Sequence, residues 1–254
     1  ASGIAGCTNI ALTTNFADAS ILNNRILVGT STGYDLGLGI LNYSTTGDRT
    51  LLVDNNLILP VSTSGVRAFY INPGVNGFTF TNNNISGQFE KTAIIQAKNG
   101  LVEDNSIVGT GSAGARSAGI GTWGYPDALI WGHTTFRRND ISKVGNGIAI
   151  FTTNDVVVEN NNFTDCDNAV YVTDYGSTSN FDPTTISINS NDLSSNTYGV
   201  FTENITNSVD ATCNWWGTAD GDDIATYVSG DVDVSSWLVP DGSGDTYFWS
   251  GGDT

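Results

Sequence analysis

The stretch that decides the fold is Val158-Glu159-Asn160-Asn161-Asn162-Phe163-Thr164. It is one copy of a recurring phrase: a few apolar or β-branched residues, a polar step, then Asn, any residue, and Ile, Leu or Phe. Three intervals between copies equal 22 residues (83 to 105, 139 to 161 and 191 to 213), and the other intervals are 6 to 12 residues longer. The copies are Asn24-Arg25-Ile26, Asn55-Asn56-Leu57, Asn83-Asn84-Ile85, Asn105-Ser106-Ile107, Asn139-Asp140-Ile141, Asn161-Asn162-Phe163, Asn191-Asp192-Leu193 and the degenerate Cys213-Asn214-Trp215. A fixed period with local insertions is typical of a stacked repeat whose insertions are loops.

Each repeat contains two or three short runs that are rich in β-branched and aromatic residues, such as residues 147–151, 156–158 and 169–172. Such composition favours strands, and the alternation of apolar and polar residues predicts one buried face for each strand. No segment shows an apolar stripe of helical period over twelve or more residues. The unit is too short for a propeller blade and matches one coil of a parallel β-helix. We therefore predict an all-β solenoid, a parallel β-helix of about eight coils.

Three motifs resemble the right-handed parallel β-helix repeat family of the pectate-lyase-like superfamily. They are the Asn-x-Ile phrase, the strands of residues 147–151 and 198–200, and Cys213-Asn214-Trp215-Trp216-Gly217. The last motif, followed by residues 228–238, is similar to the final coils of bacterial and archaeal surface proteins of this type. The resemblance covers roughly residues 10 to 238. It implies a right-handed helix in which the repeated Asn side chains form an internal ladder at a turn.

The resemblance also sets the domain boundaries and leaves the activity open. Residues 1–238 are expected to form the β-helix domain, and residues 239–254 a tail or linker that contains the cluster Tyr247-Phe248-Trp249. The family includes lyases, hydrolases, epimerases, adhesins and structural proteins. Adhesion or assembly is the function we expect, and a polysaccharide-acting lyase, hydrolase or epimerase is the alternative. No spacing in the sequence singles out a catalytic pair of carboxylates or a lyase base, so no catalytic residue is assigned.

Charge and composition exclude several classes of partner. The formal charge of −17, from 26 acidic and 9 basic residues, argues against nucleic acid and against docking to anionic membranes. No apolar run reaches the length that spans a bilayer. Few Lys and many Ser, Thr, Asn and Gly residues fit an extracellular or cell-surface protein. Cys166 and Cys213 occupy coils about 10 Å apart, too far for a disulfide, so at least one buried free thiol is expected.

Three insertions are the predicted binding surface. They lie at residues 30–54, 108–136 and 173–184, mainly between strands of the 147–151 type and strands of the 156–158 type. They should therefore project from one side of the rod. Aromatic rings stack on sugars and carboxylates bond their hydroxyls. The candidate carbohydrate site is Trp123, Tyr125, Asp127, Trp131, His133 and Tyr175. Alternatively, these aromatic residues only attach a long loop to the rod.

Two further kinds of site are suggested by short motifs. Asp220, Asp222 and Asp223 offer the hard oxygen ligands that calcium prefers, although ordinary acidic turns have the same composition. No other cofactor is implied. Glycosylation sequons stand at Asn42, Asn84, Asn162 and Asn204. Asn84 and Asn162 share one repeat position next to an inward residue, so both should point outward.

The ends of the rod are the expected sites of self-association. An open coil end presents unpaired strand edges. No amphipathic helix that could cover the first coil precedes it in the sequence. We expect another copy, a neighbouring domain or an inserted strand to cover this end, and head-to-tail stacking of copies would build a filament. A plug formed by residues 1–9 is the alternative.

Overall fold

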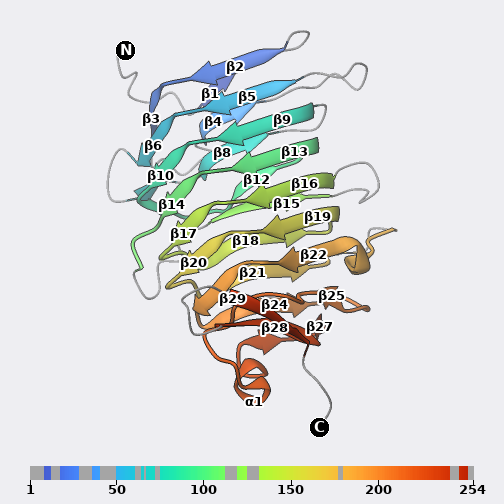
Figure 1. The fold of residues 1–254 in the computed structure, drawn as a ribbon. Coiled ribbons are helices and arrows are strands. Elements are labelled where there is room, and N and C mark those ends of the chain that lie inside the picture. Colours follow the sequence, from blue (N-terminus) through green and yellow to red (C-terminus); the bar gives the residue numbers. More distant parts are fainter. Residues whose placement is uncertain are drawn as a thin grey trace.

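The computed structural model describes residues 9–12, 18–28, 36–40, 50–60, 64–65, 67–71, 75–111, 119–124, 132–176, 180–240 and 246–250. Three parallel sheets, named A, B and C here, run the length of a rod (Figure 1). The chain visits them in the same order in each coil, and its strands stack without crossing. This architecture is the right-handed parallel β-helix predicted from the repeat.

The strands of each sheet follow one another in chain order. Sheet A contains β1 (Asn9–Leu12), β4 (Leu36–Ile40), β8 (Arg67–Ile71), β12 (Ala93–Ile95), β15 (Ile120–Trp123), β18 (Asn146–Phe151), β21 (Asn168–Thr173), β24 (Tyr198–Glu203) and β26 (Val228–Ser229). Sheet B contains β2 (Ala19–Leu22), β5 (Leu51–Asp54), β9 (Asn76–Thr81), β13 (Lys98–Glu103), β16 (Gly132–Arg137), β19 (Asn154–Glu159), β22 (Ile186–Asn189), β25 (Val209–Asp210) and β27 (Val232–Asp233). Sheet C contains β3 (Arg25–Val28), β6 (Leu57–Pro60), β10 (Asn84–Ser86), β14 (Ser106–Val108), β17 (Asp140–Ser142), β20 (Asn162–Thr164) and β23 (Asp192–Ser195). Nine, nine and seven strands confirm about eight coils.

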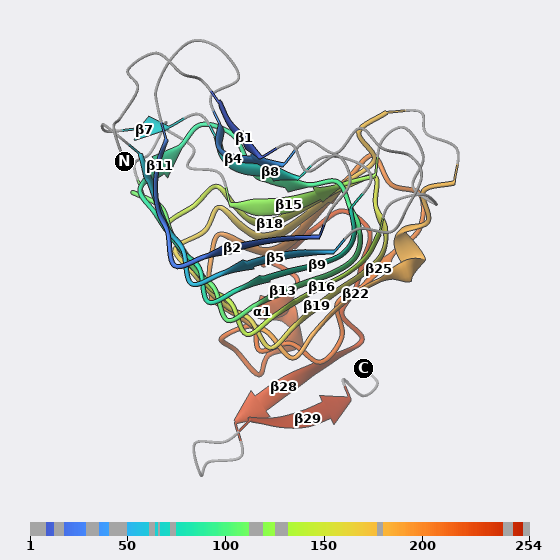
Figure 2. The same ribbon diagram turned by 90° about the horizontal axis from the view of Figure 1, so that it is seen from above.

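The three sheets enclose the interior of the rod (Figure 2). The core inside them is a set of stacked apolar side chains. In sheet B, Phe136 is paired in register with Val158, and both side chains are fully buried. Sheet C contributes a column in which Ile107 is 3% exposed and Phe163 is 1% exposed, which confirms the predicted inward register. Because side chains alternate along each strand, the neighbours Ser106 and Asn162 face outward.

The turn from sheet B to sheet C repeats one conformation in every coil. A residue with positive φ comes first, and an Asn follows it, which is buried in each of these coils except at the exposed Asn24. The positive-φ residues are Asn23, Asn55, Asn82, Asp104, Arg138, Asn160, Ser190 and Cys213. The following residues are Asn24, Asn56, Asn83, Asn105, Asn139, Asn161, Asn191 and Asn214. Each of the first seven donates its side-chain amide to the side-chain oxygen of the next along the rod. The internal ladder implied by the family resemblance is thus present.

The register predicted for two copies of the phrase was wrong by one residue. Asn55 is exposed with φ 54°, and Asn56, not Asn55, is the ladder residue. The inward residue of that coil is therefore Ile58, which is fully buried, while Leu57 is half-buried. The same shift holds at the last copy, where Asn214 joins the ladder and Trp216 is the inward residue. Consecutive Asn residues suit both positions, since Asn tolerates left-handed backbone.

The prediction that the insertions emerge on one side was also wrong. The segment 174–185 does join sheet A to sheet B. The other two insertions are divided by a strand of sheet A. In the longest, residues 109–119 lead from sheet C into β15, and residues 124–131 lead from β15 to sheet B. The insertions therefore leave both edges of sheet A.

A short helix and a hairpin follow the last coils at the C-terminal end of the rod. Helix α1 (Gly221–Ile224) buries Ile224, and the indole of Trp237 lies beside Gly221. Trp237 belongs to β28 (Ser236–Pro240), which pairs antiparallel with β29 (Thr246–Ser250). Figure 2 shows this hairpin projecting from the coils. Part of the predicted tail is thus a strand, and the boundary at residue 238 stays a prediction. In the described residues, no helix is long and apolar enough to cross a membrane.

Candidate functional site

The candidate site is a stripe of aromatic side chains on the outer face of sheet A. We call the six residues Trp123, Phe151, Tyr171, Tyr175, Tyr198 and Phe201 the aromatic stripe. Their strands bury Ile148, Ile150, Val170 and Val172 inside the helix. Since side chains alternate, Phe151 and Tyr171 face outward. The outer face of four consecutive coils thus carries rings where a solvated strand would carry polar groups.

The rings follow one another from coil to coil. Trp123 is paired in register with Phe151, and their ring centroids are 5.8 Å apart. Phe151 contacts Tyr171 diagonally at 6.0 Å, and Tyr171 stacks on its register partner Phe201 at 5.9 Å. These separations suit aromatic pairs. Because successive coils are about 4.8 Å apart, the stripe runs along the axis of the rod over about 14 Å.

Tyr175 is held against the stripe by a turn of the preceding coil. Its ring lies 5.1 Å from Trp123 and 6.2 Å from Phe151, and its side chain is 63% exposed. The hydroxyl of Thr152, which is 1% exposed, accepts a hydrogen bond of 2.8 Å from the backbone N–H of Tyr175. The same hydroxyl donates to the carboxylate of Asp174 at 3.2 Å. A buried side chain therefore positions the most exposed ring of the site.

The polar groups of the stripe are acidic or neutral. The phenol of Tyr171 donates a hydrogen bond to the carboxylate of Glu203, which is exposed on β24. Burial raises the pKa of Tyr171 to about 12, and the hydrogen bond to Glu203 also raises it. Tyr171 is therefore a neutral hydrogen-bonding group at physiological pH. Asp174 provides a second carboxylate beside Tyr175.

The structure brings together two of the residues predicted for carbohydrate binding, Trp123 and Tyr175. His133 is separate from their ring contacts: it is exposed at the start of β16, and its Nε2 lies 3.5 Å from a carboxylate oxygen of Asp155. Tyr125, Asp127 and Trp131 lie outside the described residues. The structure thus describes only part of the predicted cluster. The rings of Trp123 and Tyr175 belong to the larger aromatic stripe.

Sequence reasoning missed four residues of the stripe: Phe151, Tyr171, Tyr198 and Phe201. The sequence did contain a signal: Phe151, Tyr171 and Phe201 place an aromatic residue at an outward position of three successive strands of sheet A. These residues become neighbours only once the strands of successive coils are aligned.

The sequons and the acidic turn stay predictions. Asn84 and Asn162 are exposed at equivalent positions of sheet C, as expected, and Asn204 is exposed with φ 56°. Asn42 lies outside the described residues. Asp220 caps α1 by accepting from the backbone N–H of Asp222 at 3.0 Å, and Asp223 accepts from the hydroxyl of Thr218 at 3.3 Å. These contacts explain the acidic residues as caps of a helix N-terminus. Within the described part of the chain, no group of three or more metal-ligating side chains was found.

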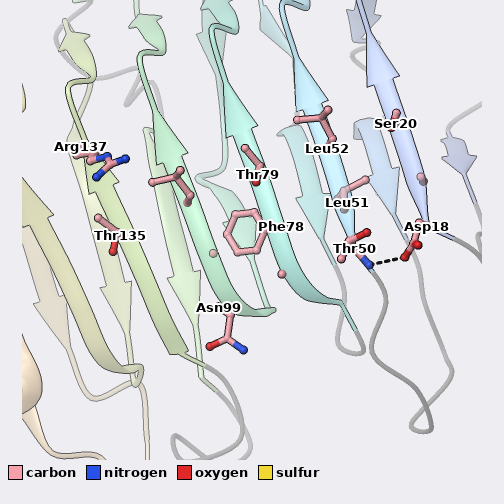
Figure 3. A pocket seen from close by; sticks show the side chains of 14 residues that line it. Asp18, Ser20, Thr50, Leu51, Leu52, Phe78, Thr79, Asn99, Thr135 and Arg137 are labelled. Atoms are coloured by element: carbon pink, nitrogen blue, oxygen red, sulfur yellow. Dashed lines mark hydrogen bonds between the residues drawn. The ribbon is translucent and has the colours of Figure 1, made fainter.

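A concavity lies on the outer face of sheet B near the N-terminal coils (Figure 3). Its lining includes Leu52, Gly77, Thr79, Leu101 and Thr135. The concavity is open to solvent. Its one aromatic lining residue, Phe78, is 1% exposed and points into the core. This surface therefore lacks the exposed rings of the stripe.

One family comparison agrees with this architecture. The family model described as a right-handed beta helix region matches residues 64–215, and the chain belongs to this family. Neither curated proteins nor solved structures gave a match.

Proposed function

We propose that this protein is an extracellular or cell-surface β-helix that binds carbohydrate and acts in adhesion. The observation that carries the proposal is the aromatic stripe, in which Trp123, Phe151, Tyr171 and Phe201 lie in sequence on one outer face. These half-buried rings and the exposed ring of Tyr175 leave apolar surface on the outer face. Such surface matches the C–H faces of sugar rings, while Tyr and Trp add polar groups.

The position of the stripe on strands supports a role in binding, rather than a role in attaching a loop to the rod. Phe151, Tyr171 and Phe201 are on strands, so rigid elements and not a loop position them. Tyr175 remains 63% exposed, although Thr152 anchors its backbone. A ring that only attached a loop to the rod would be buried by that contact.

The test is a double variant, Trp123→Ala with Phe151→Ala, examined on a glycan array and then by calorimetry with the best glycan. At about 1 kcal/mol for each ring, affinity should fall about thirtyfold. The far-ultraviolet circular dichroism should not change, because both side chains face outward. Leu52→Ala is the matched control, since Leu52 is exposed on sheet B. Equal affinity of the double variant and the control would reject the stripe as the binding site.

A polysaccharide-acting enzyme is the alternative function. The specific observation in its favour is the carboxylate of Glu203 at the stripe, bonded to the phenol of Tyr171. A glycosidase requires two carboxylates on either side of the scissile bond, and Asp174 is the second carboxylate at this surface. Incubation with neutral and acidic polysaccharides, followed by assay of new reducing ends, distinguishes the alternatives. If the protein depolymerises a polysaccharide and Glu203→Gln abolishes that activity, the function is catalysis and not adhesion.

A further inference from the structure

The net charge of this protein belongs entirely to its C-terminal part. Lys143 is the last cationic residue of the chain, and residues 144–254 contain neither Lys, Arg nor His. The same residues contain 17 of the 26 acidic side chains. Residues 1–143 contain nine acidic and nine basic side chains, so their formal charges cancel. The rod therefore has a neutral N-terminal part and a strongly acidic C-terminal part.

The aromatic stripe lies mainly on the acidic part. Its strands β18, β21 and β24 all follow Lys143, and only Trp123 precedes it. Glu203 is bonded to Tyr171 within the stripe, and Asp174 immediately precedes Tyr175. Among the described residues, the charged groups in contact with the stripe are thus carboxylates, and the charge of the C-terminal part of the sequence has the same sign. A surface potential of one sign repels ligands of that sign and lowers their local concentration.

We propose that the stripe takes a linear, non-anionic glycan along the axis of the rod and excludes uronate and sulfated chains. This inference rests on the proposed carbohydrate-binding function and adds the chemical class of the ligand. Each residue of a uronate chain would bring another negative charge toward Glu203, without a cation on β18, β21 or β24 to compensate. A neutral chain meets no such cost and contacts the solvent-facing parts of the rings.

The geometry also favours a particular shape of sugar. Ring follows ring from Trp123 to Phe201 along the axis, so an extended chain contacts more rings than a branched or compact one. Stacking requires a flat apolar face, which a pyranose provides when its hydroxyl groups are equatorial. Axial hydroxyl groups would hold the sugar away from Phe151 and Phe201, which have no hydrogen-bonding group. A β-linked, equatorial, uncharged oligosaccharide is the ligand that fits.

The experiment compares two oligosaccharides of equal length by calorimetry with the full chain: a neutral β-1,4-linked glucan and a polygalacturonate. We expect the glucan to bind with an affinity that changes less than about twofold between about 20 and about 500 mM salt, because no ion pair is formed. We expect the polygalacturonate to bind at least about tenfold more weakly at low salt. Phe201→Ala should weaken glucan binding, and the exposed sheet B variant Leu52→Ala should not.

The outcomes separate this inference from the function on which it rests. If the polygalacturonate binds as tightly as the glucan, and Phe201→Ala weakens the binding of both, the stripe binds carbohydrate but the predicted ligand class is wrong. If glucan affinity falls steeply with salt, charge attraction carries the binding and the inference is also wrong. If neither oligosaccharide binds and a glycan array is blank, the proposed function itself fails.

Discussion

The side-chain amide of Asn105 donates a hydrogen bond of 2.9 Å to the side-chain oxygen of Asn139, its counterpart 34 residues later. The same amide donates to the backbone oxygen of Phe80 at 2.9 Å. In return, the side-chain oxygen of Asn105 accepts from the backbone and side-chain amides of Asn83. Each interior member of the ladder thus joins the coil before it to the coil after it.

Asn105→Ala should therefore destabilise the protein strongly. It leaves two buried donors of Asn83 without their acceptor, at a cost of roughly 3 kcal/mol. Asn84→Ala is the matched control, since Asn84 is exposed on the neighbouring strand, and it should cost about 0.5 kcal/mol or less. Urea unfolding followed by circular dichroism measures both. Similar midpoints for the two variants would show that the ladder adds nothing to stability.

The ring of Phe78 occupies the space that a side chain at residue 100 would need. A methyl group at residue 100 would lie 1.9 Å from a ring carbon of Phe78, which is fully packed in the core. Gly100→Ala should cost about 1–3 kcal/mol through overpacking. Combining it with Phe78→Leu should cost less than the sum of the single changes, because the smaller side chain vacates the contact. Thermal unfolding measures these losses of stability. If the loss in the double variant equals the sum of the two single losses, the two residues do not interfere.

Phe163 and Asn162 test the inward register of sheet C. Phe163→Ala should cost about 3–5 kcal/mol, since it removes a buried ring from the core column. Asn162→Ala, one residue away and exposed, should cost about 0.5 kcal/mol. The comparison uses guanidinium unfolding of the two variants side by side. Equal losses would place the register wrong by one residue, because strand side chains alternate between faces.

Cys166 should make the protein sensitive to alkaline pH. Burial raises the pKa of its thiol to about 12, from an ordinary value of 9.0. The unfolded chain therefore releases this proton at lower pH than the folded chain does. Stability contributed by the neutral thiol is complete below pH 9 and is lost as pH rises toward 12.

A protein with both other cysteines replaced by Ala isolates this effect. The remaining thiol, that of Cys166, should react with a disulfide reagent only when the protein unfolds. Replacing Cys166 by Ala as well should flatten the dependence of the urea midpoint on pH between 9 and 12. Rapid labelling of native Cys166, or an unchanged slope, would contradict its burial.

The N-terminal end of the rod should mediate self-association. Among the described residues, β2 and β3 pair with one neighbour only, and Leu22 and Leu27 on these strands are 42% and 47% exposed. Unpaired apolar edges recruit further strands. We expect light scattering to show a mass that rises with concentration, and Leu22→Lys with Leu27→Lys to reduce it. Leu52→Lys, on the second coil, is the control. A monomer at every concentration would contradict association through this end.

The sequence by itself was sufficient for the repeat, the fold class and most of the register. Recurrence of Asn-x-Ile is a local pattern, and stacking identical coils is the arrangement that buries the apolar position of every copy. The inward positions of Ile107 and Phe163 followed from alternation alone. The register failed at Asn55-Asn56, where two adjacent residues suit both the left-handed turn and the ladder, and only hydrogen bonds between coils distinguish them.

The candidate site depended on the tertiary structure. Phe151, Tyr171 and Phe201 are 20 and 30 residues apart in the chain, and each looks like an ordinary strand residue. They become a surface only when strand pairing sets each coil against the next at 4.8 Å spacing. The division of the long insertion between the two edges of sheet A also required the position of β15. Local pattern determines which residues face outward, and the pairing of coils determines which of them meet.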